Sequence, residues 1–170
     1  SLPAGPAKCW AWARWAPFTS FGAYHEAYIM IEAEFDGVRY LYQPCIVVDN
    51  EIPLAAGREI WGYPKKLASF TRSWGGLEGG FGEQLLFTVE RPRTQLLMRA
   101  SMVCARKANA EELGDPLPVL SLRLIPSASS AARPSVAELV RLDVKSSLRL
   151  AADGSAELYA GAAHLELRRG

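Results

Sequence analysis

The segment Tyr24–Phe35, with the sequence YHEAYIMIEAEF, alternates in polarity with a period of two residues. Its odd positions are largely apolar, whereas three of its even positions are glutamates. Such alternation predicts a β-strand, because successive side chains of a strand point to opposite faces of the sheet. The pair Asp36-Gly37 follows, which is typical of a tight hairpin turn, and Val38–Val48 returns with VRYLYQPCIVV. The sequence therefore predicts a long β-hairpin over residues 24–48.

Further segments with strand-like patterns lie on both sides of this hairpin. Trp10 and Trp12 are spaced as neighbours on one face of an N-terminal strand. The other predicted strands are Leu67–Trp74, Leu85–Glu90, Gln95–Ala105, Val119–Ile125, Val136–Val144, a hairpin over Leu148–Tyr159 that turns at Asp153-Gly154, and His164–Leu167. Asp49-Asn50 can cap a short helix over Pro53–Ile60, and Ala108–Leu113 predicts one or two further helical turns.

These elements together predict a mainly β fold with one or two short helices. A closed or nearly closed antiparallel β-barrel is the economical arrangement for so many strands, because closure leaves no open sheet edge. A chain of 170 residues has the size of one domain and can bury roughly 70 % of its unfolded surface. We therefore expect a single domain over residues 1–170.

The charge balance and hydropathy of the chain exclude several classes of partner. Nineteen basic and eighteen acidic side chains give a formal net charge of +1, so no global field favours a polyanion or an anionic bilayer. No stretch approaches the ~18 consecutive apolar residues of a membrane span, and Ser1–Gly5 lacks the basic start of an export signal. We expect a cytoplasmic protein with neither nucleic acid nor membrane as a partner.

The sequence contains no recognisable metal or phosphate site. Its three cysteines lie far apart and form no Cys-x-x-Cys pair, so they are expected to pack in the core as small hydrophobes. They are Cys9, Cys45 and Cys104. His25 and His164 are the only histidines, too few for a typical histidine metal site. The glycine-rich run Gly75–Gly82 lacks the lysine and the following helix of a phosphate-binding loop, so we interpret it as a plain loop.

The lysines are distributed unusually. The chain has fourteen arginines and five lysines, and two of the five are adjacent at Lys65-Lys66 within the apolar, aromatic segment Gly57–Ala68. Burial disfavours the charged form of lysine, and a neighbouring like charge disfavours it further, so the pair is expected to supply a neutral, nucleophilic amine. Desolvation should outweigh direct repulsion, because adjacent side chains of a strand point to opposite faces. On spacing alone, a solvated surface pair is the alternative.

Three segments carry a resemblance to a known family: Gly22–Glu26, Val48–Glu51 and Ala56–Ala68, the last with the sequence AGREIWGYPKKLA. Their residues and spacing resemble the acetoacetate decarboxylase family, an established example of an activated lysine nucleophile, and weaker similarity continues to about Leu150. The resemblance implies the family's barrel or cone, a homo-oligomer, and chemistry that uses no cofactor and no metal. It also implies that Lys65 is the Schiff-base lysine, Lys66 its activating neighbour and Glu26 an active-site glutamate.

The implied reaction is the decarboxylation of a β-keto acid. Neutral Lys65 adds to the ketone, water leaves, and the resulting iminium accepts the electrons of the bond that releases carbon dioxide. Glu26 orients the substrate or relays the proton in this scheme. Arg14, Trp61 and Tyr63 are the predicted substrate-binding residues.

The resemblance is incomplete in the N-terminal part of the family pattern. There the family carries an arginine for the substrate carboxylate and a second active-site glutamate. The chain begins too late to contain that arginine, and the second glutamate falls near Ala11, between two tryptophans. Arg14 is therefore the candidate for the missing cation.

Three functions remain open at this point. The first is decarboxylation of an acetoacetate-like β-keto acid. The second is aldolase and dehydratase chemistry on pyruvate or another keto acid, which uses the same imine. The third is a non-catalytic barrel that binds a small molecule and retains the lysines without using them.

Overall fold

A computed structural model describes residues 8–16, 19–73, 84–113, 117–129, 132–144 and 158–168 of the chain. The predicted loop Gly75–Gly82 and the turn Asp153-Gly154 lie outside the described residues. The chain divides into two compact units, one from Ser1–Leu67 with Leu117–Val144 and one from Ala68–Pro116 with Lys145–Gly170. The described parts of both units are built on β-sheets, which confirms the predicted mainly β class.

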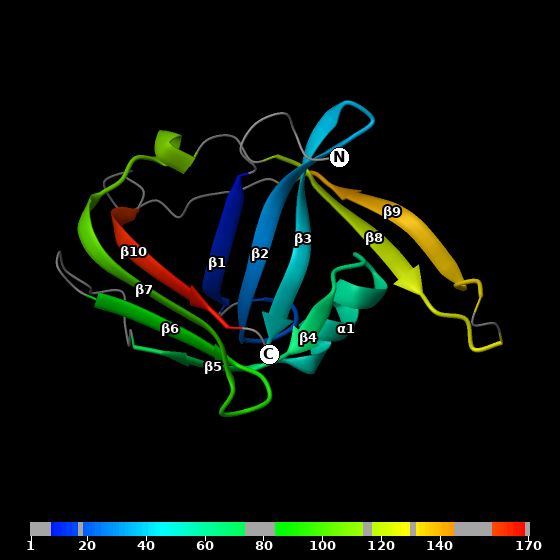
Figure 1. Cartoon of the computed structure of the whole chain (residues 1–170), viewed down its shortest axis with the longest axis horizontal. Helices are drawn as coiled ribbons and strands as arrows, with labels where there is room; N and C mark the ends of the chain where they lie inside the picture. The colour runs from blue at the N-terminus through cyan, green and yellow to red at the C-terminus, as the bar shows by residue number, and fades with distance from the viewer. Residues whose placement is uncertain are drawn as a thin grey trace. The chain divides into compact units, whose positions relative to one another are not determined.

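The first unit contains a mixed six-stranded sheet and a helix (Figure 1). Its strands run in the order β1-β2-β3-β8-β9, and the short strand β4 also pairs with β3. The elements are β1 (Cys9–Ala16), β2 (Tyr24–Phe35), β3 (Val38–Val48), α1 (Glu51–Glu59), β4 (Lys65–Leu67), β8 (Val119–Ile125) and β9 (Val136–Leu142). The predicted hairpin over residues 24–48 is confirmed with the predicted strand ends, and Asp36 and Gly37 both take positive φ angles at its turn.

One edge of β3 is shared between two strands. Leu41 pairs with Val119 of β8, whereas Ile46–Val48 pair with Lys65–Leu67 of β4, and both pairings are parallel. The β2–β3 register shifts near Met30, where one residue opposes Gln43 and Pro44. A bulge of this kind accommodates proline inside a sheet, because proline lacks the backbone N–H of a regular ladder. The shared edge leaves room for β4 beside the end of β3.

Helix α1 begins at Glu51, two residues before the predicted start. The Asn50 side chain accepts a hydrogen bond from the backbone N–H of Ile52 at 2.9 Å, so Asn50 caps the helix. Pro53 then falls in the first turn, where its missing N–H costs nothing. The chain leaves the helix through Gly62, which has a φ of +71°, and enters β4.

The second unit contains an antiparallel sheet in the order β10-β7-β6-β5. Its elements are β5 (Ser69–Arg72), β6 (Gln84–Glu90), β7 (Leu96–Lys107), the 3-10 helix η1 (Ala110–Leu113) and β10 (Tyr159–Leu167). The single strand predicted over Leu67–Trp74 is wrong, because β4 ends at Leu67 and β5 pairs into the other sheet. Phe87, Val89 and Met98 are buried in this unit.

The expected closed antiparallel barrel is not what the described residues form. Neither sheet closes on itself in the described ranges, since one path runs from β1 to β9 and the other from β10 to β5. The pairings of β3 with β4 and β8 are also parallel rather than antiparallel. Period-two alternation identifies strands, but it does not specify which strands pair, so the barrel did not follow from it.

The cysteines test a further prediction from the sequence. Cys104 is buried as predicted, but the core placement of Cys9 and Cys45 is wrong, because both are exposed.

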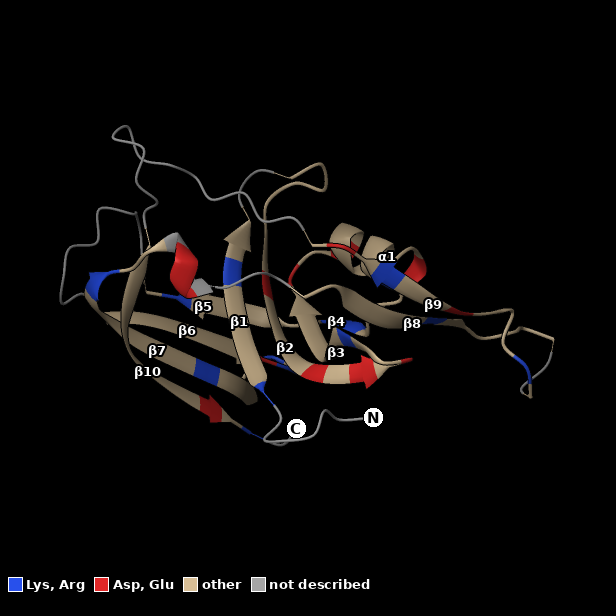
Figure 2. Cartoon of the chain, turned by 90° about the horizontal axis from the view of Figure 1, so that it is seen from above, with Lys and Arg blue, Asp and Glu red and all other residues tan. Residues whose placement is uncertain are grey.

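Basic and acidic residues are interspersed along the strands (Figure 2). Within the described ranges, no helix is long and apolar enough to cross a membrane, and no three His, Cys, Asp or Glu side chains gather as a metal site would require.

Gly62 and Gly37 form a matched pair for a stability test. Both have positive φ, +71° and +74°, but a Cβ on Gly62 would lie 2.6 Å from the backbone N and Cα of Arg123 in β8, whereas Gly37 has open space. Gly37→Ala should therefore lower the free energy of unfolding by about 1 kcal/mol, the strain of a left-handed residue. Gly62→Ala should lower it by about 3 kcal/mol because backbone must also move. Urea unfolding of the two variants measures the difference, and equal losses would contradict the close approach.

Candidate active site

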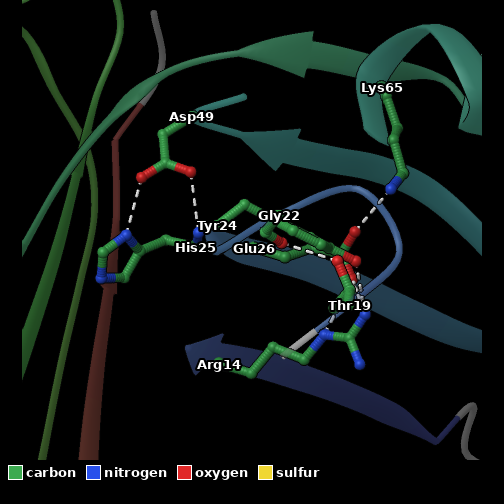
Figure 3. Close-up of polar contacts among 8 residues, drawn as sticks. All are labelled: Arg14, Thr19, Gly22, Tyr24, His25, Glu26, Asp49 and Lys65. Carbon is green, nitrogen blue, oxygen red and sulfur yellow. Dashed lines mark hydrogen bonds and ion pairs between the residues drawn. The ribbon is translucent and has the colours of Figure 1, made fainter. Parts of the chain in front are cut away.

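Lys65 is buried and its amine contacts a carboxylate. It begins β4 and is 5 % exposed, and its Nζ lies 2.6 Å from Oε2 of Glu26 on β2, which is 4 % exposed (Figure 3). The sheet register explains this contact. Lys65 pairs with Ile46 and Glu26 pairs with Val48, two residues further along β3, so both side chains stand on the same face.

Arg14 contacts the other oxygen of the same carboxylate. It lies directly opposite Glu26 in the β1–β2 register, and its Nε donates to Oε1 at 3.1 Å while Nη2 lies 2.9 Å from Oε1. The Glu26 carboxylate therefore lies between two cations, with Lys65 and Arg14 approaching it from different strands (Figure 3). Two charged partners offset the high cost of removing a carboxylate from water.

Arg14 is only partly removed from solvent. Its side chain is 51 % exposed, and besides Glu26 it donates from Nη2 to the hydroxyl of Tyr24 at 3.1 Å. Burial acts to lower the pKa of Arg14, but the neighbouring Glu26 carboxylate more than compensates, so the pKa is raised and the guanidinium stays charged. Among the described residues, Nη1 of Arg14 has no hydrogen-bond partner, so one edge of the guanidinium can receive an anion.

Three tyrosines surround the charged groups. The ring of Tyr24 lies 5.7 Å from Nζ of Lys65 and 5.9 Å from Cζ of Arg14, within range of cation–π attraction. Burial, with the charges of Glu26 and Tyr28 acting in the same direction, raises the pKa of Tyr63 to about 12. Burial also raises the pKa of Tyr28. These phenols are protonated at neutral pH and can act as hydrogen-bond donors.

Gly57 of α1 lies against the methylene chain of Lys65. A Cβ at this position would lie 2.5 Å from Cδ and 2.6 Å from Cε of Lys65, closer than real side chains approach. Glycine inside a helix costs about 1 kcal/mol relative to alanine, so the helix gives up stability where the lysine passes. The backbone N–H of Tyr63 also donates to the Gly57 carbonyl at 2.9 Å, which fixes the turn between α1 and β4.

His25 and Asp49 hold the start of β2 on the opposite face from Glu26. The His25 backbone N–H donates to Oδ1 of Asp49 at 2.7 Å, and its Nδ1 lies 2.7 Å from Oδ2 (Figure 3). The Trp15 ring lies 4.4 Å from the imidazole. Because Asp49 immediately follows β3, this clamp fixes the first residues of β2 beside the end of β3, and Glu26 with them.

The structure brings together four of the six predicted site residues: Glu26, Lys65 and Arg14 in direct contact, and Tyr63 within the electrostatic influence of Glu26. It places the other two elsewhere. Lys66 pairs with Val47 and is exposed, so the predicted interior position is wrong for Lys66, while the expectation of opposite faces is confirmed. Trp61 is 37 % exposed, and its carbonyl accepts a hydrogen bond from Ser121.

Sequence reasoning missed Tyr24 and Gly57. Tyr24 precedes Glu26 by two residues on the same strand, so the period-two pattern already placed both on one face. Gly57 had no comparable signal, because a helix glycine beside a lysine eight residues later is recognised only once the turn between them is known.

Comparison with known proteins identifies relatives of this chain. The sequence pattern of the family described as acetoacetate decarboxylase (ADC) matches residues 2–169. The chain belongs to the acetoacetate decarboxylase family. Schiff-base formation on a lysine is characteristic of this family.

Several relatives of this chain are longer proteins. The acetoacetate decarboxylase of Burkholderia ambifaria is 32 % identical over 130 residues, which cover 75 % of this chain and 50 % of that protein. The solved acetoacetate decarboxylase from Legionella pneumophila superposes with a TM-score of 0.71 at 24 % identity, over 92 % of this chain and 58 % of that one. The enduracididine biosynthesis enzyme MppR, solved with pyruvate, superposes with a TM-score of 0.68 at 19 % identity, over 88 % and 55 %. The chain spans about half the length of these relatives.

Gly57→Ala separates helix stability from the position of the amine. Alanine should raise the helical stability of α1 by about 1 kcal/mol but force the flexible Lys65 chain aside, which should slow reductive alkylation of Lys65 by acetaldehyde and borohydride about tenfold. Peptide mass spectrometry reads this rate, and Lys66 in the same peptide is the internal control. Unchanged Lys65 labelling in the folded variant would contradict the role of Gly57.

Proposed function

We propose that this protein is a Schiff-base-forming lyase that decarboxylates a β-keto acid through an imine on Lys65. The observation that carries the proposal is the buried contact between Nζ of Lys65 and the Glu26 carboxylate at 2.6 Å. A buried amine with an adjacent proton acceptor is what a nucleophilic lysine requires. Membership of the acetoacetate decarboxylase family supports the same chemistry.

Glu26 receives the first proton in this scheme. An ammonium has no lone pair, so Lys65 must lose a proton before it attacks, and Oε2 of Glu26 is within direct transfer distance. The amine then adds to the ketone carbon, and the carbinolamine loses water to give an iminium. The electron pair of the bond to the carboxylate carbon moves into the iminium as carbon dioxide departs. Protonation of the enamine carbon and hydrolysis release the ketone and regenerate the amine.

Arg14 holds the substrate carboxylate in the proposal. Its guanidinium is half exposed, shares the Glu26 carboxylate with Lys65, and keeps Nη1 unengaged among the described residues. A β-keto acid whose ketone carbon reaches Nζ of Lys65 therefore has its carboxylate on the side of Arg14. In this proposal the neutral amine of Lys65 forms because burial disfavours the ammonium and Glu26 accepts its proton. Lys66 has no part in this step, because it is exposed on the other face.

Aldolase and dehydratase chemistry is the second candidate. The specific observation that favours it is the fold shared with MppR, a protein solved with the condensation product of pyruvate and imidazole 4-carboxaldehyde. Both reactions need the same lysine imine, so the product formed distinguishes them. A non-catalytic binding protein is the third candidate and needs no imine.

Borohydride trapping tests the imine and the reaction together. Incubation with acetoacetate and borohydride should place an adduct on Lys65 with the mass of the decarboxylated ketone, read by peptide mass spectrometry. Lys65→Met should abolish the adduct, and Lys107→Met, which removes an exposed lysine of β7, should not. An adduct that retains the carboxylate favours condensation chemistry. No adduct in the folded protein leaves only the binding function.

Glu26→Gln tests the proton acceptor. The amide keeps the shape of the carboxylate but cannot accept a proton from the ammonium, so trapping on Lys65 should slow about 100-fold at neutral pH. The loss should shrink as pH rises, because hydroxide then replaces Glu26 as the acceptor. A variant that traps as fast as the parent across this range would exclude Glu26 from proton transfer.

A further inference from the structure

An aromatic wall borders the candidate site on the outer two strands of the first unit. We define it as Trp10 and Trp12 of β1 with Tyr28 and Met30 of β2. Trp10 lies opposite Met30 and Trp12 opposite Tyr28 in the strand register, and the next pair along the same face is Arg14 with Glu26. Same-face pairs follow each other at about 7 Å along a strand, so the wall begins one pair away from the charged groups.

The aromatic wall also lies in register with Lys65 across the sheet. Lys65 pairs with Ile46, Ile46 with Tyr28, and Tyr28 with Trp12, so the four residues form one line across β4, β3, β2 and β1. The Lys65 side chain leaves this line to reach Glu26 on the neighbouring one. A carbonyl carbon bonded to Nζ therefore lies between the line that holds Arg14 and the line that holds Tyr28 and Trp12.

Trp12 presents a flat ring on the same face of β1 as Arg14. Its ring is nearly parallel to that of Tyr28, with an interplanar angle of 17° and a centroid distance of 6.2 Å, and the residue remains 46 % exposed. The opposite face of β1 at Ala11 and Ala13 carries only methyl groups. Two of the three tryptophans of β1 therefore lie on the face of the charged groups, whereas Trp15 packs against His25 on the other face.

We infer that the site takes keto acids with a planar aromatic group attached to the ketone carbon, an inference that rests on the proposed function. The substrate carboxylate lies on Arg14, the ketone carbon on Lys65, and the substituent over Tyr28 and Trp12. Aromatic rings gain from offset stacking beyond their buried area, whereas a methyl group covers little of either ring. The chemistry at Lys65 is the same decarboxylation for both kinds of substituent.

The kinetic test compares two β-keto acids that differ only in this substituent. The ratio of kcat/KM for 3-oxo-3-phenylpropanoate to that for acetoacetate should be about 10 or more and should fall about tenfold in Trp12→Ala. Phe35→Ala is the matched control, because Phe35 is equally exposed at 46 % but lies at the turn of the β2–β3 hairpin. Trp12→Phe keeps a ring and should retain most of the preference. A ratio near 1, or one that Trp12→Ala leaves unchanged, would overturn the inference.

A binding test separates this inference from the proposed function. Lys65→Met cannot form an imine, and calorimetry of this variant with 3-phenylpropanoate and butanoate measures recognition alone. The phenyl compound should bind about tenfold more tightly, and adding Trp12→Ala should remove the difference. If no keto acid is trapped on Lys65 while this Trp12-dependent difference persists, the lyase proposal fails and the aromatic carboxylate site stands. Equal binding of the two compounds would overturn the aromatic site, whatever the outcome of trapping.

Discussion

The described part of the first unit is organised around the buried carboxylate of Glu26. Glu26 is 4 % exposed in the middle of a sheet, where an unpaired carboxylate would cost several kcal/mol of desolvation free energy. Its two oxygens are each taken by a cation, Lys65 from β4 and Arg14 from β1. This requirement accounts for the positions of both outer elements, because a shift of one residue in either strand would turn the cation to the opposite face.

The elements around Glu26 each help to position the contact between its carboxylate and the Lys65 amine. The bulge at Gln43 and Pro44 lies where β3 passes from β8 to β4, and the start of β2 is clamped to the end of β3 by His25 and Asp49. Gly57 leaves space along α1 for the methylene chain of Lys65, and Gly62 lets the following turn approach Arg123 of β8. Helix, turn and strand thus combine to deliver one amine to one carboxylate. The same contact places the Lys65 amine beside the Glu26 carboxylate, which can accept its proton. The pairing that stabilises the buried charge is therefore also the pairing that the proposed reaction needs.

The sequence predicted the parts of this arrangement that depend on local patterns. The hairpin over residues 24–48 followed from the alternation in Tyr24–Phe35 and an Asp-Gly turn, and turn residues mark the point where each strand ends. The helix begins two residues before the predicted start, because Asn50 caps it directly and Pro53 falls within its first turn rather than at its first position. The roles of Lys65 and Glu26 came from the family resemblance, and their contact follows only from the parallel pairing of β4 with β3, which no alternation pattern encodes. The sequence did not predict the open sheets, the split between β4 and β5 or the exposure of Lys66. Each of these features depends on which strands pair, and an alternation pattern does not specify the pairing.

A double-mutant cycle between Glu26 and Lys65 tests the central claim most directly. Urea unfolding of the parent, Glu26→Gln, Lys65→Met and the double variant measures the coupling free energy between the two side chains. If the buried pair organises the unit, Glu26→Gln leaves the buried ammonium without its carboxylate and Lys65→Met leaves the carboxylate with only the half-exposed Arg14. The double variant then loses at least about 2 kcal/mol less than the two single losses added together. Losses that add within about 0.5 kcal/mol would show that the two groups do not interact in the folded protein and would contradict the account.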